Sequence, residues 1–485
     1  MTTRPDDLVR VIGTRQFNVL DQEVFASISR DRNPMHVDPV AARRLLTGLP
    51  VVHGVHVLMT ALEYWVNEDA LIPSALNCTF NNAINVDDTV VFSQKNDAPG
   101  RFVIEARVNG LPCAVLRMTA QRPGVQPAGQ TAASELKTGA SSYFERVDIP
   151  IDESPAHHLK RPYVIRVDKL ELSDHFPRVV RSLGSSRAVG LLTLSYFVGM
   201  VCPGLNSIFS TINLKLDDSE HGAEAIEFAV DQYDERFRLF NVSLRGVLAG
   251  GLTAFLRPTP QPQLSMAEVA KSVDPAEFSG TRSLVIGASR GLGELTAKIL
   301  AAGGGDVTIS YAQGLADIEM VNAEINASGM GSCRIQRLDV TSEDAFRQID
   351  FRALDAIYLF ATPRIYRKKA EVFVGALFDE FLDAYVRSLY KLCQHIESLA
   401  LERKIGIYVP STVFISERPD GLVEYAMAKA AAEVLIEDIN RSFRRVSILS
   451  TRLPRLSTDQ TSSVLKLSTG VNLTALLPVV RAMAK

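Results

Sequence analysis

The sequence lacks the features that mark several classes of protein. Its five cysteines are scattered without a CxxC pair, so neither a zinc site nor a disulfide framework is indicated. The formal net charge is only −3, too small an imbalance to attract nucleic acid or an anionic membrane. No apolar run reaches the roughly 18 residues of a spanning helix, and the start MTTRPDDLVRVIG has no signal-peptide pattern. We therefore expect a cytoplasmic protein that binds no nucleic acid, no membrane and no metal.

What the chain does have is the composition of a folded protein. It contains 485 residues, of which 46% are hydrophobic and 22% are charged. That length is too great for one hydrophobic core and predicts several domains. Two stretches rich in linker residues, 121–142 and 257–265, divide the chain into segments 1–120, 143–257 and 280–485.

The first two segments have the same predicted order of elements. Residues 51–66 and 187–201 are apolar nearly all round, which predicts a helix buried on every side. Each is followed by four short runs rich in β-branched residues, which predict strands; these runs are 76–84, 88–94, 101–110 and 113–121, and then 210–218, 225–232, 238–246 and 250–258. A buried helix wrapped by a curled antiparallel sheet is the hot-dog fold. Two copies predict an α+β double hot dog.

The third segment changes character. Residues 283–312 predict a strand, a glycine turn, a helix and a second strand, and apolar strands follow at 355–363, 404–415 and 446–454 between helical stretches. Strands that alternate with helices indicate a parallel sheet covered on both faces. We expect an α/β Rossmann fold with a doubly wound parallel sheet.

The decapeptide RDRNPMHVDP at 30–39 gathers polar side chains around a proline. On a regular helix Asp31 and His36 would point about 140° apart, so a helix cannot direct both at one atom. Pro34 favours an extended or turning segment, in which a carboxylate and an imidazole can share one water and move its proton. The alternative is that Asp31 or Asn33 only caps the next helix and His36 is an ordinary loop residue.

The pattern continues beyond this loop, because AARRLLTGLPVVHG follows and His53–Gly54 opens the buried helix. Segment 1–120 resembles the MaoC-like, (R)-specific enoyl-thioester hydratases and dehydratases. Their pattern of SGDxNPxH, an alanine and HG stands here as SRDRNPMH, Ala41 or Ala42, and VHG.

This resemblance implies that Asp31 and His36 are the catalytic pair and that Asn33 is a supporting polar contact on the substrate side. It also implies that the backbone N–H of Gly54 helps to polarise the thioester carbonyl. Arg30 stands where the family has glycine, and its side chain could crowd the site, pair with Asp31 or reach a substrate phosphate.

The second segment lacks this motif. Its LSDHFPRVVRSLG places Asp174 and His175 next to each other, and neighbouring side chains rarely converge on one atom. We therefore expect a surface turn there and a non-catalytic second repeat, which shapes the acyl tunnel and pairs with the first repeat.

A glycine turn, GASRGLG at 287–293, follows an apolar strand and opens a helix. Gly287 permits the tight turn, Gly291 lets a pyrophosphate approach the backbone, and Gly293 permits close helix packing. Further along, Tyr425 and Lys429 lie four residues apart on one helical face. A nearby ammonium can lower the pKa of a tyrosine and make it a usable acid for ketone reduction.

With Ser411 and Asp339, these features resemble the short-chain dehydrogenase/reductase family over 280–460. The resemblance implies that Tyr425 is the catalytic acid, that Lys429 tunes it and binds the ribose, and that Ser411 orients the substrate. It implies further that Asp339 contacts the adenine. Ser289 and Arg290 in the glycine turn, with no acid in TISYAQG, favour a 2′-phosphate and hence NADPH.

Three departures distinguish this segment from the family. LFAT at 359–362 replaces NNAG, Tyr385 aligns with the family's relay asparagine, and the chain ends soon after TRLPRLSTDQT. A substrate lid could therefore come from the hot-dog half or from another subunit, and we expect a homo-oligomer.

Together the two resemblances predict a bifunctional 3-oxoacyl-thioester reductase and (R)-3-hydroxyacyl-thioester dehydratase in acyl-chain biosynthesis, because the product of one reaction is the substrate of the other. The acyl group would be carried on CoA or on acyl carrier protein. The alternatives are a catabolic enoyl-CoA hydratase/3-hydroxyacyl-CoA dehydrogenase and an acyl-binding protein with a decayed reductase.

Overall fold

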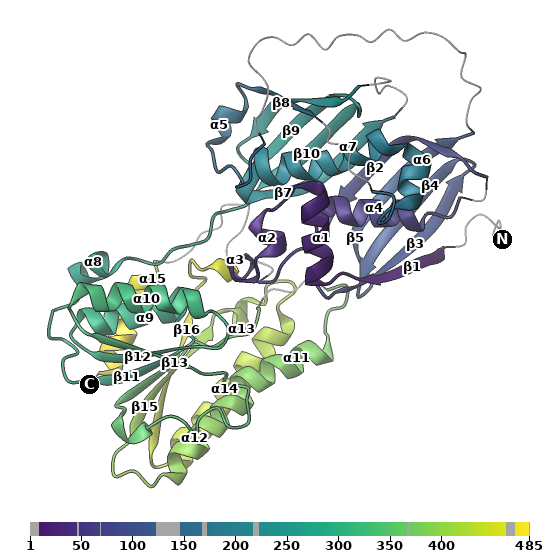
Figure 1. The fold of residues 1–485 in the computed structure, drawn as a ribbon. Helices are drawn as coiled ribbons and strands as arrows, with labels where there is room; N and C mark the ends of the chain where they lie inside the picture. The colour runs from purple at the N-terminus through teal and green to yellow at the C-terminus, as the bar shows by residue number, and fades with distance from the viewer. Residues whose placement is uncertain are drawn as a thin grey trace. The chain divides into compact units, whose positions relative to one another are not determined.

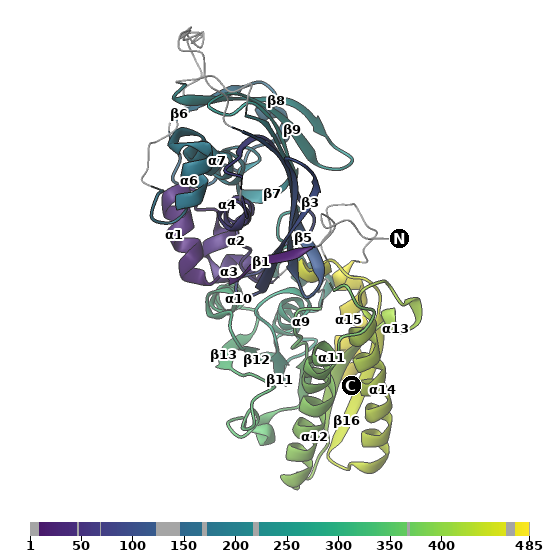
Figure 2. The same cartoon turned by 90° about the vertical axis from the view of Figure 1, so that its right-hand side faces the viewer.

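The chain folds into two compact units that meet between Thr259 and Pro260, inside the predicted linker 257–265. The computed structural model describes residues 9–45, 48–67, 69–122, 146–166, 172–216, 223–365, 369–461 and 471–484. Residues 123–142 of the first predicted linker, 121–142, lie outside the described residues. Figure 1 and Figure 2 show the two units.

The first unit contains one sheet of ten strands in the order β1-β3-β4-β5-β2-β7-β10-β9-β8-β6. The first repeat supplies β1 (Arg10–Gln16), β2 (Ile72–Phe80), β3 (Thr89–Ala98), β4 (Arg101–Val108) and β5 (Leu111–Gln121). The second repeat supplies β6 (Pro162–Arg166), β7 (Ser207–Lys215), β8 (Ala225–Asp234), β9 (Leu239–Gly246) and β10 (Gly250–Leu256). The repeats join where β2 pairs antiparallel with β7, and each covers an edge of the other.

Two long buried helices, α4 (Gly54–Tyr64) and α7 (Ser185–Tyr196), pack on the inner face of this curled sheet (Figure 2). All residues of α4 from Val55 to Leu62 are buried, and so are all residues of α7 from Ala188 onwards, as their all-round apolar sequences predict. A π-helical turn, Phe197–Val201, extends α7. The predicted double hot dog is confirmed.

The other helices of this unit are α1 (Val19–Ser29), α2 (Pro34–Val37), α3 (Pro39–Ala42), α5 (Pro155–His158), which lies beside β8, and α6 (Pro177–Leu183). Helix α1 was not predicted, although its start carries a capping box in which Asn18 and Asp21 bond to each other's backbone N–H. Asp174 and His175 lie exposed in a turn before α6, as expected.

The second unit contains a parallel sheet of six strands in the order β13-β12-β11-β14-β15-β16. The strands are β11 (Arg282–Ile286), β12 (Asp306–Tyr311), β13 (Ser332–Arg337), β14 (Ala356–Leu359), β15 (Ile405–Thr412) and β16 (Val446–Leu453). One face carries α8 (Met266–Val269), α9 (Gly291–Ala302), α10 (Leu315–Ser328) and α15 (Asn472–Met483). The other carries α11 (Gly375–Leu382), α12 (Ser388–Ser398) and α14 (Val423–Ser442), and a short α13 (Phe414–Glu417) follows β15.

Alternating side chains of the central strand show why both faces are covered. Val285 packs into the hydrophobic cluster beneath α9, while its neighbours Leu284 and Ile286 pack into the cluster on the opposite face. This arrangement confirms the predicted doubly wound Rossmann fold. Within the described part of the chain, none of the helices has the length and apolarity that a bilayer crossing requires.

Candidate active sites

The loop between α1 and α2 has the irregular backbone that its proline predicts. Arg30 ends α1 with φ of 65°, a left-handed conformation that glycine adopts at far lower cost. Asn33 caps α2 by accepting the backbone N–H of Met35, and Pro34 is the first helical residue. Arg30 therefore holds, under strain, a backbone conformation that suits glycine.

Asp31 is buried and held by the second repeat. Its Oδ2 accepts a hydrogen bond of 2.7 Å from the Ser195 hydroxyl on α7, and its Oδ1 accepts the backbone N–H of Asn33 at 3.2 Å. A Cβ on Gly199 would lie 2.2 Å from Oδ1, so only glycine at 199 leaves room for the carboxylate. Burial raises the pKa of Asp31 to about 7, and the Ser195 hydrogen bond opposes that rise.

His36 lies at the end of α2 with one ring nitrogen fixed. Its Nδ1 is 2.5 Å from the carbonyl oxygen of Val51, so Nδ1 carries the proton and donates it there. The lone pair of a neutral ring is then on Nε2. Burial lowers the pKa of His36 to about 4, and the positive charge of Arg257, beyond the end of β10, lowers it further.

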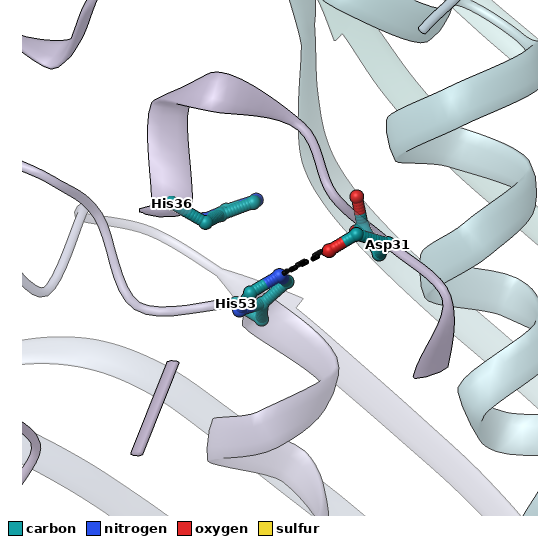
Figure 3. A group of neighbouring side chains, drawn as sticks. All are labelled: Asp31, His36 and His53. Carbon is teal, nitrogen blue, oxygen red and sulfur yellow. Dashed lines mark hydrogen bonds and ion pairs between the residues drawn. The ribbon is translucent and has the colours of Figure 1, made fainter. Parts of the chain in front are cut away.

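Asp31, His36 and His53 form one buried cluster, in which one side-chain oxygen or nitrogen of each lies within 4.8 Å of the others (Figure 3). The imidazole rings of His36 and His53 stack with centroids 3.8 Å apart. His53 Nε2 is 3.0 Å from the backbone oxygen of Asp31 and 4.0 Å from its Oδ2. Because that carbonyl oxygen lies at Nε2, the ring needs a proton there, and the contact does not suit a metal ion.

The remaining motif residues have clear structural positions. The side-chain amide of Asn33 is fully buried and donates to the backbone oxygens of Gly199, Gly204 and Leu205. This amide therefore ties the loop to the second repeat, and the expected contact of Asn33 on the substrate side stays a prediction. Gly54 is the first residue of α4, where a backbone N–H has no acceptor within the helix.

The glycine turn of the second unit lies at the carboxyl end of β11. Gly287 has φ of +81°, and a Cβ there would lie 2.7 Å from the backbone nitrogen of Ala361. A Cβ on Gly293 would lie 2.3 Å from the oxygen of Gly287, so the turn packs directly against α9. Gly291, with φ of +63°, starts α9, and Ser289 is buried beside it. This geometry fits a pyrophosphate at a helix N-terminus.

Tyr425 on α14 meets a hydroxyl from the end of β15, but not the predicted one. Successive strand residues face opposite sides, and it is Thr412 that hydrogen-bonds to Tyr425. Ser411 instead donates to Glu433 at 2.5 Å, and Glu433 also pairs with Arg452. The structure thus places Thr412, and not Ser411, beside the tyrosine, and the expected role of Ser411 in orienting the substrate stays a prediction. The sequence alone does not distinguish Ser411 from Thr412, because both are hydroxyl residues and they are neighbours in the chain.

Lys429 lies nearer to the ring of Tyr385 than to that of Tyr425, whose centroid is 6.0 Å from its Nζ, and the expected effect of Lys429 on Tyr425 stays a prediction. Its Nζ donates to the backbone oxygen of Pro410 at 2.8 Å and lies 3.9 Å from the centroid of the Tyr385 ring. Burial lowers the pKa of Lys429 to about 7 and raises the pKa of Tyr425 to about 12. Tyr385, whose hydroxyl bonds to Thr362, sits in a π-helical turn, Asp383–Arg387, between α11 and α12.

Two predicted cofactor residues already have protein partners. Asp339 follows β13, and its Oδ1 accepts both the backbone N–H and the hydroxyl of Thr341. Arg290 lies 3.3 Å from the buried carboxylate of Asp459. A 2′-phosphate would therefore share or replace Asp459 as the acceptor for Arg290.

Comparison with known families agrees with both units. Residues 3–99 match the model of the MaoC like domain. Residues 282–465 match the model of the short chain dehydrogenase family. The two matches show a MaoC-like domain at the N-terminus and a short-chain dehydrogenase domain at the C-terminus, consistent with a fusion.

Individual relatives match the second unit. The 3-oxoacyl-[acyl-carrier-protein] reductase of Synechocystis sp. is 28% identical over 196 residues, which is 38% of this chain and 76% of the relative. A short chain dehydrogenase from Burkholderia cenocepacia, solved in complex with NADP, is 26% identical; the match covers 38% of this chain and 78% of that one, with a TM-score of 0.34. A 3-oxoacyl (acyl-carrier-protein) reductase from Agrobacterium tumefaciens with NADP bound is 21% identical, covering 38% and 75%, with a TM-score of 0.35.

Replacing Ser195 tests whether the second repeat sets the charge state of Asp31. Ser195→Ala removes the hydrogen bond that lowers the pKa of Asp31, so that pKa should rise above about 7. We expect the Asp31 limb of the pH–rate profile for thioester hydration to move to higher pH. The rate should fall by about 10- to 100-fold, as for a lost hydrogen bond to a charged group.

Thr193→Val is the matched control, because the Thr193 hydroxyl donates to Val189 within the same helix. It should leave the profile in place. A Ser195→Ala profile that coincides with the wild-type profile would contradict the prediction.

Proposed function

We propose that the protein is a bifunctional enzyme, an NADPH-dependent 3-oxoacyl-thioester reductase joined to an (R)-3-hydroxyacyl-thioester dehydratase that serves acyl-chain biosynthesis. The observation that carries the proposal is the buried pair of Asp31 and His36. Burial raises the pKa of Asp31 and lowers the pKa of His36. At neutral pH such a pair contains a protonated acid and an unprotonated base within a few ångströms, which elimination of water requires.

In the proposed dehydration, His36 Nε2 removes the proton from C2 of the 3-hydroxyacyl thioester. Protonated Asp31 gives its proton to the departing hydroxyl, which leaves as water. The backbone N–H of Gly54, at the positive end of α4, polarises the thioester carbonyl and stabilises the charge that develops there. Hydration is the same path in reverse, with Asp31 ionised and His36 protonated.

The proposed reductase uses the glycine turn, Tyr425 and Lys429. Gly287, Gly291 and the start of α9 would hold the pyrophosphate of NADPH, and Arg290 would bind its 2′-phosphate. The bound nicotinamide supplies the hydride. Tyr425, positioned by Thr412, would protonate the ketone oxygen, and Lys429 would bind the ribose. Asp339 would contact the adenine of NADPH once it gives up its hydrogen bonds to Thr341.

Acyl thioesters on CoA or acyl carrier protein are the proposed substrates for both sites. The Synechocystis relative, named as a reductase of 3-oxoacyl-[acyl-carrier-protein], supports the substrate class for the second unit. A second candidate is an acyl-thioester hydratase whose reductase site binds the cofactor without turnover. It is favoured by the pKa of Tyr425 near 12 and by the position of Lys429 over Tyr385. An NADPH-oxidation assay with acetoacetyl thioester on both carriers separates the two, because only the first candidate oxidises NADPH.

The dehydratase assignment is tested by Asp31→Asn and His36→Ala. Each removes one proton carrier, so hydration of a crotonyl thioester should fall by at least about 10²-fold. NADPH binding, measured by fluorescence titration, should be unchanged because the nucleotide site lies in the other unit.

Asp38→Asn is the matched control, since Asp38 caps α3 through the backbone N–H groups of Val40 and Ala41 and lies in the same loop. Near-wild-type hydration by Asp31→Asn would refute the assignment.

The reductase assignment is tested by Tyr425→Phe, which removes the proton donor and keeps the ring. Ketone reduction should fall by about 10² to 10⁴-fold while NADPH binding persists. Tyr390→Phe is the control, because Tyr390 is a half-exposed tyrosine whose ring lies beside Phe443, away from Tyr425. Reduction that survives Tyr425→Phe would assign the proton donor elsewhere.

The cofactor preference is tested through Arg290. NADPH should bind at least about tenfold more tightly than NADH, a difference of about 1.4 kcal/mol. Arg290→Gln should abolish that preference. Arg282→Gln should not, because Arg282 lies at the opposite end of β11 and pairs with Asp355. Equal affinities of the wild-type protein for the two nucleotides would contradict the role of Arg290.

A further inference from the structure

The protonation of His53 can be deduced from its contacts. The side-chain oxygen of Gln22 accepts the backbone N–H of His53 at 3.1 Å, and a backbone nitrogen can only donate. The amide nitrogen of Gln22 lies 3.4 Å from Nδ1 of His56, as the same orientation requires. These two contacts fix which end of the Gln22 amide faces His53.

With the amide so fixed, both ring nitrogens of His53 face acceptors. Nδ1 is 2.9 Å from the Gln22 side-chain oxygen, and Nε2 is 3.0 Å from the backbone oxygen of Asp31. A neutral imidazole has one N–H and one lone pair, so it can satisfy only one of them. Both contacts are satisfied together only by an imidazolium. Its counter-charge would be the Asp31 carboxylate, 4.0 Å from Nε2.

Burial acts against this separation of charge. It lowers the pKa of His53 and raises that of Asp31, which favours a proton on the carboxyl group and a neutral ring. The titratable groups around His53 are Asp31 on the loop, His36 stacked on it from α2, and His56 on α4 itself. Arg257 acts on His36. The hydrogen-bond pattern and the burial thus favour opposite locations for one proton.

We propose that His53 and Asp31 share a single proton and that His53 is the positioning residue that stores it for Asp31. The inference rests on the proposed dehydratase function. When the proton moves, the Nε2–H bond of the imidazolium breaks and leaves its electron pair on nitrogen. A lone pair of the carboxylate oxygen forms the new O–H bond. Charges of +1 and −1 become two neutral groups, and no other reactant is consumed.

The store then completes the catalytic cycle. Protonated Asp31 gives its proton to the leaving hydroxyl, while His36 takes the C2 proton. After water has left, His36 is protonated, Asp31 is ionised and His53 is neutral. Return of the proton from His36 to the Asp31–His53 pair, all within 4.8 Å, restores the starting state. The substrate has lost one H and one OH as water, so the atoms balance.

The first test measures His53 directly, without substrate. In protein labelled with ¹⁵N-histidine, the two ring nitrogens of His53 should have nearly equal chemical shifts around neutral pH, as in an imidazolium or a shared-proton pair. His56 is the internal control and should show the widely separated shifts of a neutral ring, because its Nδ1 accepts from Gln22. In Asp31→Asn the counter-charge is gone, and His53 should become neutral.

A neutral His53 in the wild-type protein, or a pattern that Asp31→Asn leaves unchanged, would overturn the proposal. Because no turnover is involved, a protein that hydrates no thioester can still show the shared proton. In that case the proposed function and the catalytic use of the store fail, whereas the proton shared by His53 and Asp31 stands.

The second test compares His53→Gln with His56→Gln, two buried histidines at the N-terminus of α4, the first being its N-cap residue. Loss of His53 should lower hydration at least about tenfold. It should also move the Asp31 limb of the pH–rate profile to higher pH, because a proton donor and a positive charge are lost. His56→Gln should leave the limb in place. If both variants lose rate equally and neither shifts the limb, His53 has only a structural role.

Discussion

The hydrogen bond from Ser195 to Asp31 is the contact on which the first unit's chemistry depends. It links a loop of the first repeat to the central helix of the second, and Gly199 and the Asn33 amide complete the same junction. A carboxylate buried alone would take up a proton and keep it. Because Ser195 on α7 supplies one donor and Gly199 in the following π-helical turn leaves space for the side chain, the pKa of Asp31 stays near neutrality, where the group can both give and receive a proton.

This junction changes the role of the second repeat. The repeat lacks the motif, yet it supplies Ser195, Gly199 and, beyond β10, Arg257 around the candidate site. The pairing of β2 with β7 makes one sheet of the two repeats and so fixes α7 against the motif loop. In the second unit the residues of the candidate site support one another less closely. Lys429 Nζ lies 3.9 Å from the centroid of the Tyr385 ring and 6.0 Å from that of the Tyr425 ring, so its closer aromatic contact is with Tyr385.

The sequence predicted both folds, because the buried helices and the alternating strands have strong periodic patterns. It also predicted that Asp31 and His36 lie together, since Pro34 excludes a continuous helix. It did not predict Ser195 or Gln22, because side chains more than a hundred residues apart, or on an unpredicted helix, meet only through packing. The HG pair drew attention to His53. The pair alone, however, does not reveal that both ring nitrogens of His53 face hydrogen-bond acceptors. Ser411 was chosen over Thr412 because strand register cannot be read to one residue from sequence.

The most direct measurement is a crystal structure of the protein with an amide analogue of a 3-hydroxybutyryl thioester, in which NH replaces the sulfur so that the carbonyl group is kept and the C2 proton is too weakly acidic to be removed. The account predicts that the 3-hydroxyl group lies within hydrogen-bond distance of Asp31, that C2 faces Nε2 of His36, and that the carbonyl oxygen accepts the N–H of Gly54. An analogue bound against the second repeat, with no contact to Asp31 or His36, would contradict it.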